Sequence, residues 1–169
     1  MNEEIQALFQ ADQADRQADR PLPPDLTERD RARRETLEGL IAAGALQTTE
    51  DYFHAALIFQ HGEHLNDYWR ARELAIQAAE RGSRPGRWLA AAAYDRWLMR
   101  QGKPQKYGTQ YVASGGCWML WELDSATTDE ERAAWNVPAL AEARRRAEEM
   151  TQQDPPPQDA MPPHAQDAD

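Results

Sequence analysis

The spacing of apolar residues along the chain predicts a mainly helical protein. Ile5, Leu8 and Phe9 begin an amphipathic helix that should end before Pro21, because apolar residues three and four positions apart share one helix face. Later stripes with the same spacing indicate further helices. These stripes are Leu37, Leu40 and Ile41; Phe53, Ala56 and Leu57; Leu74, Ala75 and Ala78; and Trp88, Leu89 and Ala92.

Capping residues and glycines predict where these helices begin and end, since Ser, Thr, Asp and Asn favour helix starts and Gly favours helix ends. The candidate caps are Asp25 or Thr27 for the second helix, Thr48 or Thr49 for the third and Asn66 or Asp67 for the fourth. Pro85 belongs to the first turn of a fifth helix that ends near Gly102. The third, fourth and fifth helices are joined by short loops. We therefore expect antiparallel neighbours, with packing similar to one or two tetratricopeptide or Sel1-type units.

The pattern changes after Gly102. Residues 107–112 and 117–123 are rich in aromatic and β-branched side chains and flank Ser114-Gly115-Gly116, a pattern that predicts a β-hairpin. Thr127 or Thr128 should cap a last helical region that residues 135–138 interrupt, because the residue before Pro138 avoids helical geometry. The predicted fold class is mainly α: antiparallel helical hairpins, a small C-terminal β-hairpin and a final helix.

The chain of 169 residues is long enough for one domain with its own core. We expect residues 1–150 to form that domain. Residues 151–169 contain many Pro and Asp residues, no Lys or Arg and almost no large apolar side chain. Such a segment buries too little surface to offset its ordering entropy, so we expect a disordered tail.

Net charge and the length of apolar runs indicate which classes of partner the protein can bind and in which cellular compartment it is expected. The formal charge is −10, whereas nucleic-acid binding requires clustered Lys and Arg. The dense basic run at residues 144–146 is followed by Glu148-Glu149, and no apolar run approaches the roughly 20 residues of a membrane helix. The acidic start, Met1 to Glu4, is unlike a signal peptide, and the single Cys117 fits a reducing compartment. We predict a cytoplasmic protein that binds neither nucleic acid nor membrane.

Polar side chains continue the apolar stripes of three predicted helices. Burying such groups without partners costs several kcal/mol, so they must pair with one another, reach water at a cleft or hold a ligand. Each one alone has a structural explanation, such as an i,i+4 ion pair or a helix C-terminal cap. Their recurrence in three helices indicates a pocket at a common end. The residues are Asp12 and Arg16 in the first helix, Gln60 and His61 in the third, and Asp95 and Arg96 in the fifth.

The segment that leaves the fifth helix adds polar groups around a glycine. Gln105, Tyr107, Thr109 and Gln110 surround Gly108, where the backbone can approach a ligand closely and the amides can donate and accept. The segment is either a recognition loop over the helix ends or a plain turn into a strand. Cys117, between Gly116 and Trp118, is expected to pack within the hairpin.

A metal site built on His54, His61 and His64 is the weaker interpretation of the histidines. His64 follows the break at Gly62, and the sequence lacks the two-His, one-Glu spacing of a zinc hydrolase helix. No glycine-rich phosphate loop and no serine nucleophile elbow is present. We therefore predict neither a metal nor a cofactor.

Several short blocks resemble, in the same order, the signature blocks of a bacterial domain family to which no activity is assigned. The resemblance covers nearly everything before the tail and is most specific at residues 107–110. It implies a shared site that includes Gln13, but it implies no named function. The blocks are Asp12-Gln13-Ala14-Asp15-Arg16, Gln60-His61-Gly62, Asp95-Arg96, Gly102 to Gln110, Thr128 to Arg132 and Asn136-Val137-Pro138.

Two functions follow from these residues. The first is an enzyme or binding domain for a small polar or anionic molecule, with His61, Asp95 and Arg96 as catalytic residues. His61 would carry a proton near neutral pH, and the arginines would bind charge. The ligand-binding residues would be Asp12, Gln13, Arg16, Gln60, Gln105, Tyr107, Gly108, Thr109 and Gln110. The alternative is a non-catalytic helical module that holds a partner protein. No residue supports a third possibility, a toxin or antitoxin component.

Overall fold

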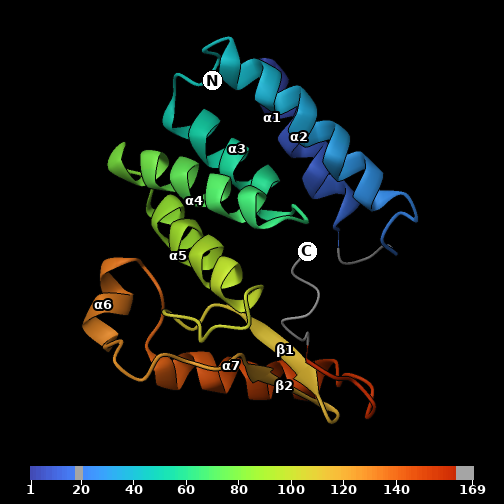
Figure 1. Ribbon diagram of the computed structural model, residues 1–169, viewed down its shortest axis with the longest axis vertical. Helices are drawn as coiled ribbons and strands as arrows, with labels where there is room; N and C mark the ends of the chain where they lie inside the picture. The colour runs from blue at the N-terminus through green and yellow to red at the C-terminus, as the bar shows by residue number, and fades with distance from the viewer. Residues whose placement is uncertain (18–20, 163–169) are drawn as a thin grey trace. The chain divides into compact units, whose positions relative to one another are not determined.

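The computed structural model describes residues 1–17 and 21–162. Its contacts divide the chain into two compact units, Met1–Ala90 and Ala91–Asp169. In the described ranges the chain forms seven helices and one two-stranded antiparallel hairpin, as Figure 1 shows. This confirms the predicted mainly helical class with a small hairpin.

The first unit consists of helices packed around a small apolar core. It contains α1 (Glu3–Asp15), α2 (Leu26–Ala42), α3 (Thr49–Gln60), α4 (Leu65–Glu80) and the start of α5 (Arg84–Met99). Helices α3 and α4 pack as an antiparallel pair, and α1 contacts both α2 and α3 (Figure 1). Ile5, Leu37, Ile58 and Leu74 are at most 2% exposed. This packing fixes α1 against the C-terminal end of α3, where His61 follows.

Helix α3 begins at the predicted capping residue, whereas α4 begins at a different one. Thr48 caps α3 in a capping box with Asp51, which confirms the predicted start. Helix α4 begins after His64, so the prediction of Asn66 or Asp67 as its cap is wrong. The Asp67 carboxylate instead reaches back to accept hydrogen bonds from the amides of Glu63 and His64. An acidic residue at the third helical position is part of the same capping geometry, which explains the error.

The second unit combines the end of α5 with a hairpin and two further helices. Strands β1 (Tyr111–Ser114) and β2 (Cys117–Leu120) pair antiparallel, and α6 (Asp129–Ala134) and α7 (Leu140–Gln153) follow. Gly115 and Gly116 both have positive φ, +56° and +81°, as a two-residue hairpin turn with primed geometry requires. The strands are shorter than predicted because residues 107–110 form a loop held by side chains of this unit.

Exposure corrects two expectations about individual side chains. Trp88, placed on the inward stripe of the fifth helix, is 42% exposed, whereas Leu89 and residues 90–93 are at most 2% exposed. The buried face of α5 therefore runs through small residues that permit close contact. Cys117 is exposed rather than packed, because side chains alternate along β2 and Cys117 and Met119 share the outer face.

The last helix, α7, ends later in the chain than predicted. Helix α7 continues to Gln153, three residues into the segment assigned to the tail. Residues 163–169, which belong to the predicted disordered tail, lie outside the described residues. Among the residues that the structure describes, no helix has the length and apolar character needed to cross a membrane.

Candidate functional site

The residues selected from the sequence form two clusters, one in each unit. The first-unit cluster contains Asp12, Gln13, Arg16 and His61, with Gln60 next in the chain. The second-unit cluster contains Asp95, Arg96 and the loop residues Gln105, Tyr107, Gly108, Thr109 and Gln110. The inward placement predicted for Asp12, Gln60 and Asp95 is confirmed, since they are at most 6% exposed.

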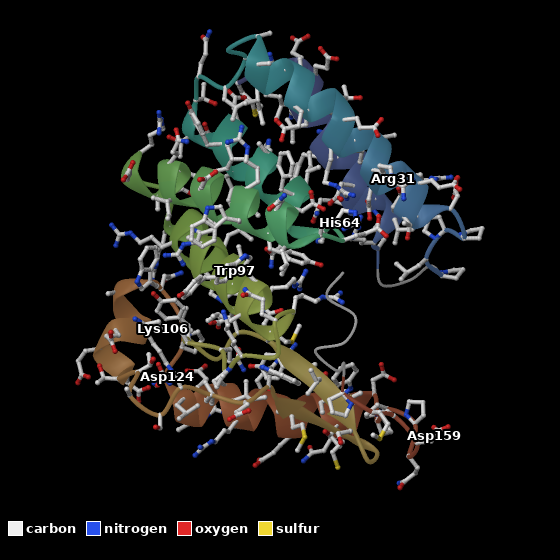
Figure 2. All side chains as sticks on the ribbon, in the orientation of Figure 1. Arg31, His64, Trp97, Lys106, Asp124 and Asp159 are labelled. Atoms are coloured by element: carbon white, nitrogen blue, oxygen red, sulfur yellow. The ribbon has the colours of Figure 1, made fainter. Side chains whose placement is uncertain are left out.

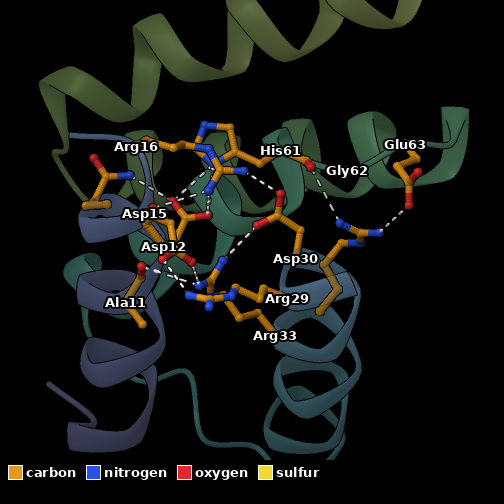
Figure 3. Close-up of polar contacts among 12 residues, drawn as sticks. Ala11, Asp12, Asp15, Arg16, Arg29, Asp30, Arg33, His61, Gly62 and Glu63 are labelled. Carbon is orange, nitrogen blue, oxygen red and sulfur yellow. Dashed lines mark hydrogen bonds and ion pairs between the residues drawn. The ribbon is translucent and has the colours of Figure 1, made fainter. Parts of the chain in front are cut away.

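A buried carboxylate and an imidazole form the centre of the first-unit cluster. Asp12 on α1 is fully buried, and Nδ1 of His61 lies 3.0 Å from each of its carboxylate oxygens. The Nη1 of Arg16 donates to Oδ1 of Asp12 at 2.8 Å, and Nε2 of Gln13 donates to Oδ2 at 2.8 Å. Figure 3 shows His61 and Arg16 above the carboxylate of Asp12. The aspartate therefore joins three donors from two helices.

The position of His61 determines which of its ring nitrogens is available. His61 occupies the C-terminal cap position of α3. Because Nδ1 faces an ionised acceptor, we assign the proton of the neutral ring to Nδ1, which leaves the lone pair on Nε2. The side chain is 21% exposed. In the described part of the chain Nε2 makes no hydrogen bond, so it can exchange a proton with a ligand or water.

Gly62 lets the chain turn tightly directly after His61. A Cβ atom at Gly62 would lie 2.2 Å from Cβ of Asp67, far inside van der Waals contact. The hydroxyl of Tyr68 donates to the carbonyl oxygen of Gly62 at 2.8 Å. The turn between α3 and α4 is thus held from both sides, and it fixes the backbone that carries His61.

Ion pairs extend the first-unit cluster along α1 and α2. Arg16 also donates through Nη2 to Asp30, and Asp30 accepts from Arg33 at 2.8 Å. Arg33 in turn pairs with Asp15 (Figure 3). The hydrogen bond from Arg33 is the main cause that holds the pKa of Asp15 below its usual value, while burial opposes it. Carboxylates and guanidinium groups of α1 and α2 therefore alternate in one ion-paired chain that begins at Asp12 beside His61.

Asp30 and Arg33 were not selected from the sequence, although a signal for them exists. They stand seven and four residues before Leu37, on the apolar stripe of the second predicted helix. The rule that selected Asp12 and Asp95, polar residues on an apolar stripe, applies equally to them. Both are buried.

The carboxylate at the centre of the second-unit cluster has different partners. Asp95 on α5 is fully buried. It accepts hydrogen bonds from the amides of Lys106, Tyr107 and Thr109, at 2.8, 2.9 and 3.0 Å, and from the hydroxyl of Thr109 at 2.8 Å. Burial raises the pKa of Asp95, and these four donors oppose that rise. Asp95 thereby holds the loop that follows α5.

Two buried glutamines complete the same loop. Gln105 donates to the carbonyl oxygens of Gln110 and Trp121, at 3.0 and 2.8 Å, and accepts from the amide of Gln110 at 2.9 Å. Nε of Arg96 donates to Oε1 of Gln110 at 3.0 Å. Gly108 has a φ of +86°, which favours glycine. The polar groups of the predicted recognition loop thus bond largely to the loop itself.

Arg132 is a further buried side chain of this loop that sequence reasoning did not select. It is 2% exposed, and it donates to the carbonyl oxygens of Tyr107 and Thr127, both at 3.0 Å. It also pairs with Asp129. An arginine in the short α6 has no apolar stripe beside it, so periodicity gave no signal. Its signal in the sequence was the resemblance block from Thr128 to Arg132.

The three histidines of the rejected metal hypothesis have different surroundings. The ring of His54 stacks on Phe9 with centroids 4.0 Å apart, and burial lowers its pKa. His64 is exposed at the start of α4, where Figure 2 labels it. Within residues 1–17 and 21–162 there is no group of three His, Cys, Asp or Glu side chains placed to hold a metal ion.

Comparison of the chain with protein-family models, with curated proteins and with solved structures finds no match. The resemblance of the sequence blocks to a bacterial domain family therefore stays a prediction, and the candidate site rests on geometry.

Proposed function

We propose that the chain performs acid–base chemistry on a small polar molecule, with His61 as the residue that carries the proton. The observation that supports this most strongly is the buried carboxylate of Asp12 at 3.0 Å from Nδ1 of a partly exposed imidazole. In this arrangement Asp12 orients the ring and stabilises its protonated form after Nε2 takes a proton. Arg16 holds Asp12 in place and does not contact the ligand.

The charges of the first-unit cluster favour a neutral or positively charged ligand over an anion. Both terminal nitrogens of Arg16 already donate to carboxylates, those of Asp12 and Asp30. Arg34, which donates to the carbonyl oxygen of His61 at 3.5 Å, likewise lies 3.6 Å from the carboxylate of Asp67 and 3.7 Å from that of Glu63. These guanidinium groups beside His61 therefore already have carboxylate partners, with which an added anion would have to compete. We therefore narrow the expected ligand to polar molecules without net negative charge.

Asp95 and its loop have a structural role in this proposal. Their side chains are engaged by backbone groups of the same loop, so their burial is accounted for without a ligand. The earlier assignment of Asp95 and Arg96 as catalytic, and of Gln105 and residues 107–110 as ligand-binding, stays an untested prediction.

A thermal-shift screen of small amines, amides, alcohols and carboxylates tests the proposed site. We expect ligands that stabilise the wild-type protein to lose their effect on the His61→Ala and Asp12→Asn variants. They should keep it on the matched control His64→Ala, because His64 lies at the start of α4 and makes no hydrogen bond to Asp12 in the part of the chain that the structure describes. Compounds that stabilise all four proteins equally, or a set of ligands made up of carboxylates, would contradict the proposal.

A helical module that binds a partner protein is the second candidate function. Trp69 and Trp88 support it, since they are 40% and 42% exposed and large exposed aromatic side chains often mark interaction surfaces. The antiparallel packing of α3 on α4 also fits the proposal of tetratricopeptide or Sel1-like helix pairing.

Melting temperature and ligand binding together separate the two candidates. If the first-unit cluster is only a structural network, His61→Ala should lower the melting temperature and Trp69→Ser should leave it unchanged. Neither change would then affect the ligand shifts of the screen. If the cluster is an acid–base site, His61→Ala should remove those shifts with little loss of stability, as is common for active-site polar residues.

A further inference from the structure

The β-hairpin of the second unit holds a proline-rich segment of its own chain. Residues 154–160 read Asp-Pro-Pro-Pro-Gln-Asp-Ala. The indole Nε1 of Trp118 donates to the carbonyl oxygen of Asp154 at 2.8 Å, and the amide of Gly115 donates to the carbonyl oxygen of Ala160 at 3.2 Å. Figure 2 shows the neighbouring Asp159 beside the turn of the hairpin. Both ends of this seven-residue segment, Asp154 and Ala160, are thus bound through their carbonyl oxygens.

This mode of contact suits the chemistry of proline-rich chains. Proline has no N–H group, so a proline run offers carbonyl acceptors and few donors of its own. Within the segment the amide of Ala160 donates to the carbonyl oxygen of Pro157 at 3.0 Å, and the carbonyl oxygens of Asp154 and Ala160 are left to bond to the hairpin. Surfaces that recognise such segments place N–H donors next to aromatic side chains. Trp118 provides both, and Gly115 provides a second donor. At Gly116 a Cβ atom would lie 2.8 Å from Nε2 of Gln158, so glycine there lets the segment lie close.

A groove of about 470 Å³ continues from Trp118 between β2 and α7. Leu120, Trp121 and Leu123 supply its apolar wall on one side, and Ala147 of α7 lies on the other. Residues 154–162 do not contribute to its lining. The chain's own proline-rich segment therefore uses Trp118 at one end of the groove and leaves the rest of the groove open.

We propose that Trp118 and this groove, together the hairpin groove, bind a proline-rich segment of a partner protein, and that residues 154–160 act as its intramolecular competitor. A partner segment longer than the chain's own can bond to the indole of Trp118 and also lie along Leu120 and Trp121. Because it needs the same indole, it must displace Asp154. An attached competitor lowers the apparent affinity for the free segment. This proposal involves no residue of the first-unit cluster and does not rest on the proposed function.

The test is a titration of the full-length chain with a labelled synthetic peptide that carries two Asp-Pro-Pro-Pro runs, followed by fluorescence anisotropy. Replacing Pro155, Pro156 and Pro157 together by Ala weakens the competitor. This triple variant should bind the peptide at least about threefold more tightly than the wild type, since the competitor no longer reduces the population of open grooves. Trp118→Phe in the triple variant should weaken binding about threefold or more, because the hydrogen bond from the indole to the peptide is lost.

Controls make the result specific to the hairpin groove. Trp88→Phe, in the first unit, should leave the affinity unchanged, and a peptide with Ala in place of every Pro should not bind. Leu120→Lys, which blocks the groove without altering the indole, should abolish binding, and circular dichroism checks that each variant is folded. The proposal is overturned if the triple variant shows no saturable binding, binds no more tightly than the wild type, or keeps its affinity after Trp118→Phe or Leu120→Lys.

Discussion

Asp12 in the first unit and Asp95 in the second are both fully buried carboxylates on helices, yet their partners differ. Asp95 accepts from three backbone amides and one hydroxyl of a single loop. Asp12 accepts from the side chains of Gln13, Arg16 and His61. Backbone donors cannot change their protonation state, whereas an imidazole can. A buried aspartate therefore indicates chemistry only when its partners can take up or release a proton.

The exposure of those partners strengthens the contrast. The side chain of His61 is 21% exposed, so a ligand can reach the ring while Asp12 stays protected from water. Gln105 and Gln110 of the loop around Asp95 and Arg132 of α6 are all at most 6% exposed. The side chains of Gln105 and Arg132 bond to the backbone of that loop. The second-unit cluster fixes a loop, and the first-unit cluster holds a titratable side chain at an accessible position.

The largest expected effect is the loss of stability on replacing Asp95. Asp95→Ala leaves the amides of Lys106, Tyr107 and Thr109 without their acceptor, and a stranded buried group costs about 1–3 kcal/mol. We expect the free energy of unfolding to fall by more than about 3 kcal/mol in urea titrations. Asp12→Ala should cost less, because Arg16 keeps its bond to Asp30. Equal losses for the two variants would remove the distinction between the clusters.

The next largest loss of stability is expected for Gly62→Ala, in the first unit. The added Cβ would overlap Cβ of Asp67, and overpacking of this kind costs about 1–3 kcal/mol. Gly39→Ala is the matched control, since a Cβ at Gly39 in α2 meets nothing within 4 Å. That change should stabilise the protein by up to about 1 kcal/mol through helix propensity. Thermal unfolding of the two variants should thus shift in opposite directions.

Asp30→Asn tests whether the ion pairs behind Asp12 position the site. Arg16 is shared between Asp12 and Asp30. Removal of the Asp30 charge should strengthen the ion pair between Arg16 and Asp12, and Asp12 would then hold the Nδ1 proton of His61 less strongly. We expect the reactivity of His61 towards diethyl pyrocarbonate to fall about two- to fivefold, a change of under about 1 kcal/mol. Asp30→Glu should restore most of it. A purely structural role for Asp30 would leave the reaction rate unaltered.

The smallest expected effect is a pH dependence at the start of α3. Burial opposes ionisation of Asp51, but hydrogen bonds from the amides of Asn2, Thr48 and Gln47 outweigh it, so its pKa is lowered. The resulting stabilisation is complete above the unfolded pKa of about 3.9 and is lost as the pH falls through the lower folded pKa. Unfolding measured from pH 5 to pH 2 should show a shallower loss of stability in Asp51→Asn than in the wild type. Parallel curves would contradict this assignment.

The sequence predicts the helices well because periodic apolar stripes and caps are local signals. The capping box of Thr48, the helix end at His61 and the interruption before Pro138 all follow from neighbouring residues. The start of α4 was misplaced because Asp67 bonds backwards along the chain. The hairpin strands were overestimated because Asp95, far from the hairpin in sequence, holds residues 107–109 in a loop.

Periodicity selected the buried polar residues but could not identify their partners. It found Asp12 and Asp95 by the same rule, although one pairs with His61 and the other with backbone amides. A stripe specifies which face is buried, and it contains no information on which donors approach from another helix or loop. The distinction between a proton-carrying site and a loop anchor therefore came from the three-dimensional contacts.

The most direct test of this account is the rate at which diethyl pyrocarbonate modifies His61, measured by peptide mass spectrometry with His64 as the internal reference. The measurement is made at mildly alkaline pH, where unprotonated imidazole, the form that reacts, predominates. If Asp12 keeps the proton on Nδ1 and the lone pair on Nε2, Asp12→Asn should slow the modification of His61 about tenfold, or about 1.4 kcal/mol. Asp95→Asn should leave the His61 rate unchanged in protein that circular dichroism shows to be folded. An unaltered His61 rate in Asp12→Asn would contradict the claim that this buried carboxylate prepares His61 to exchange a proton.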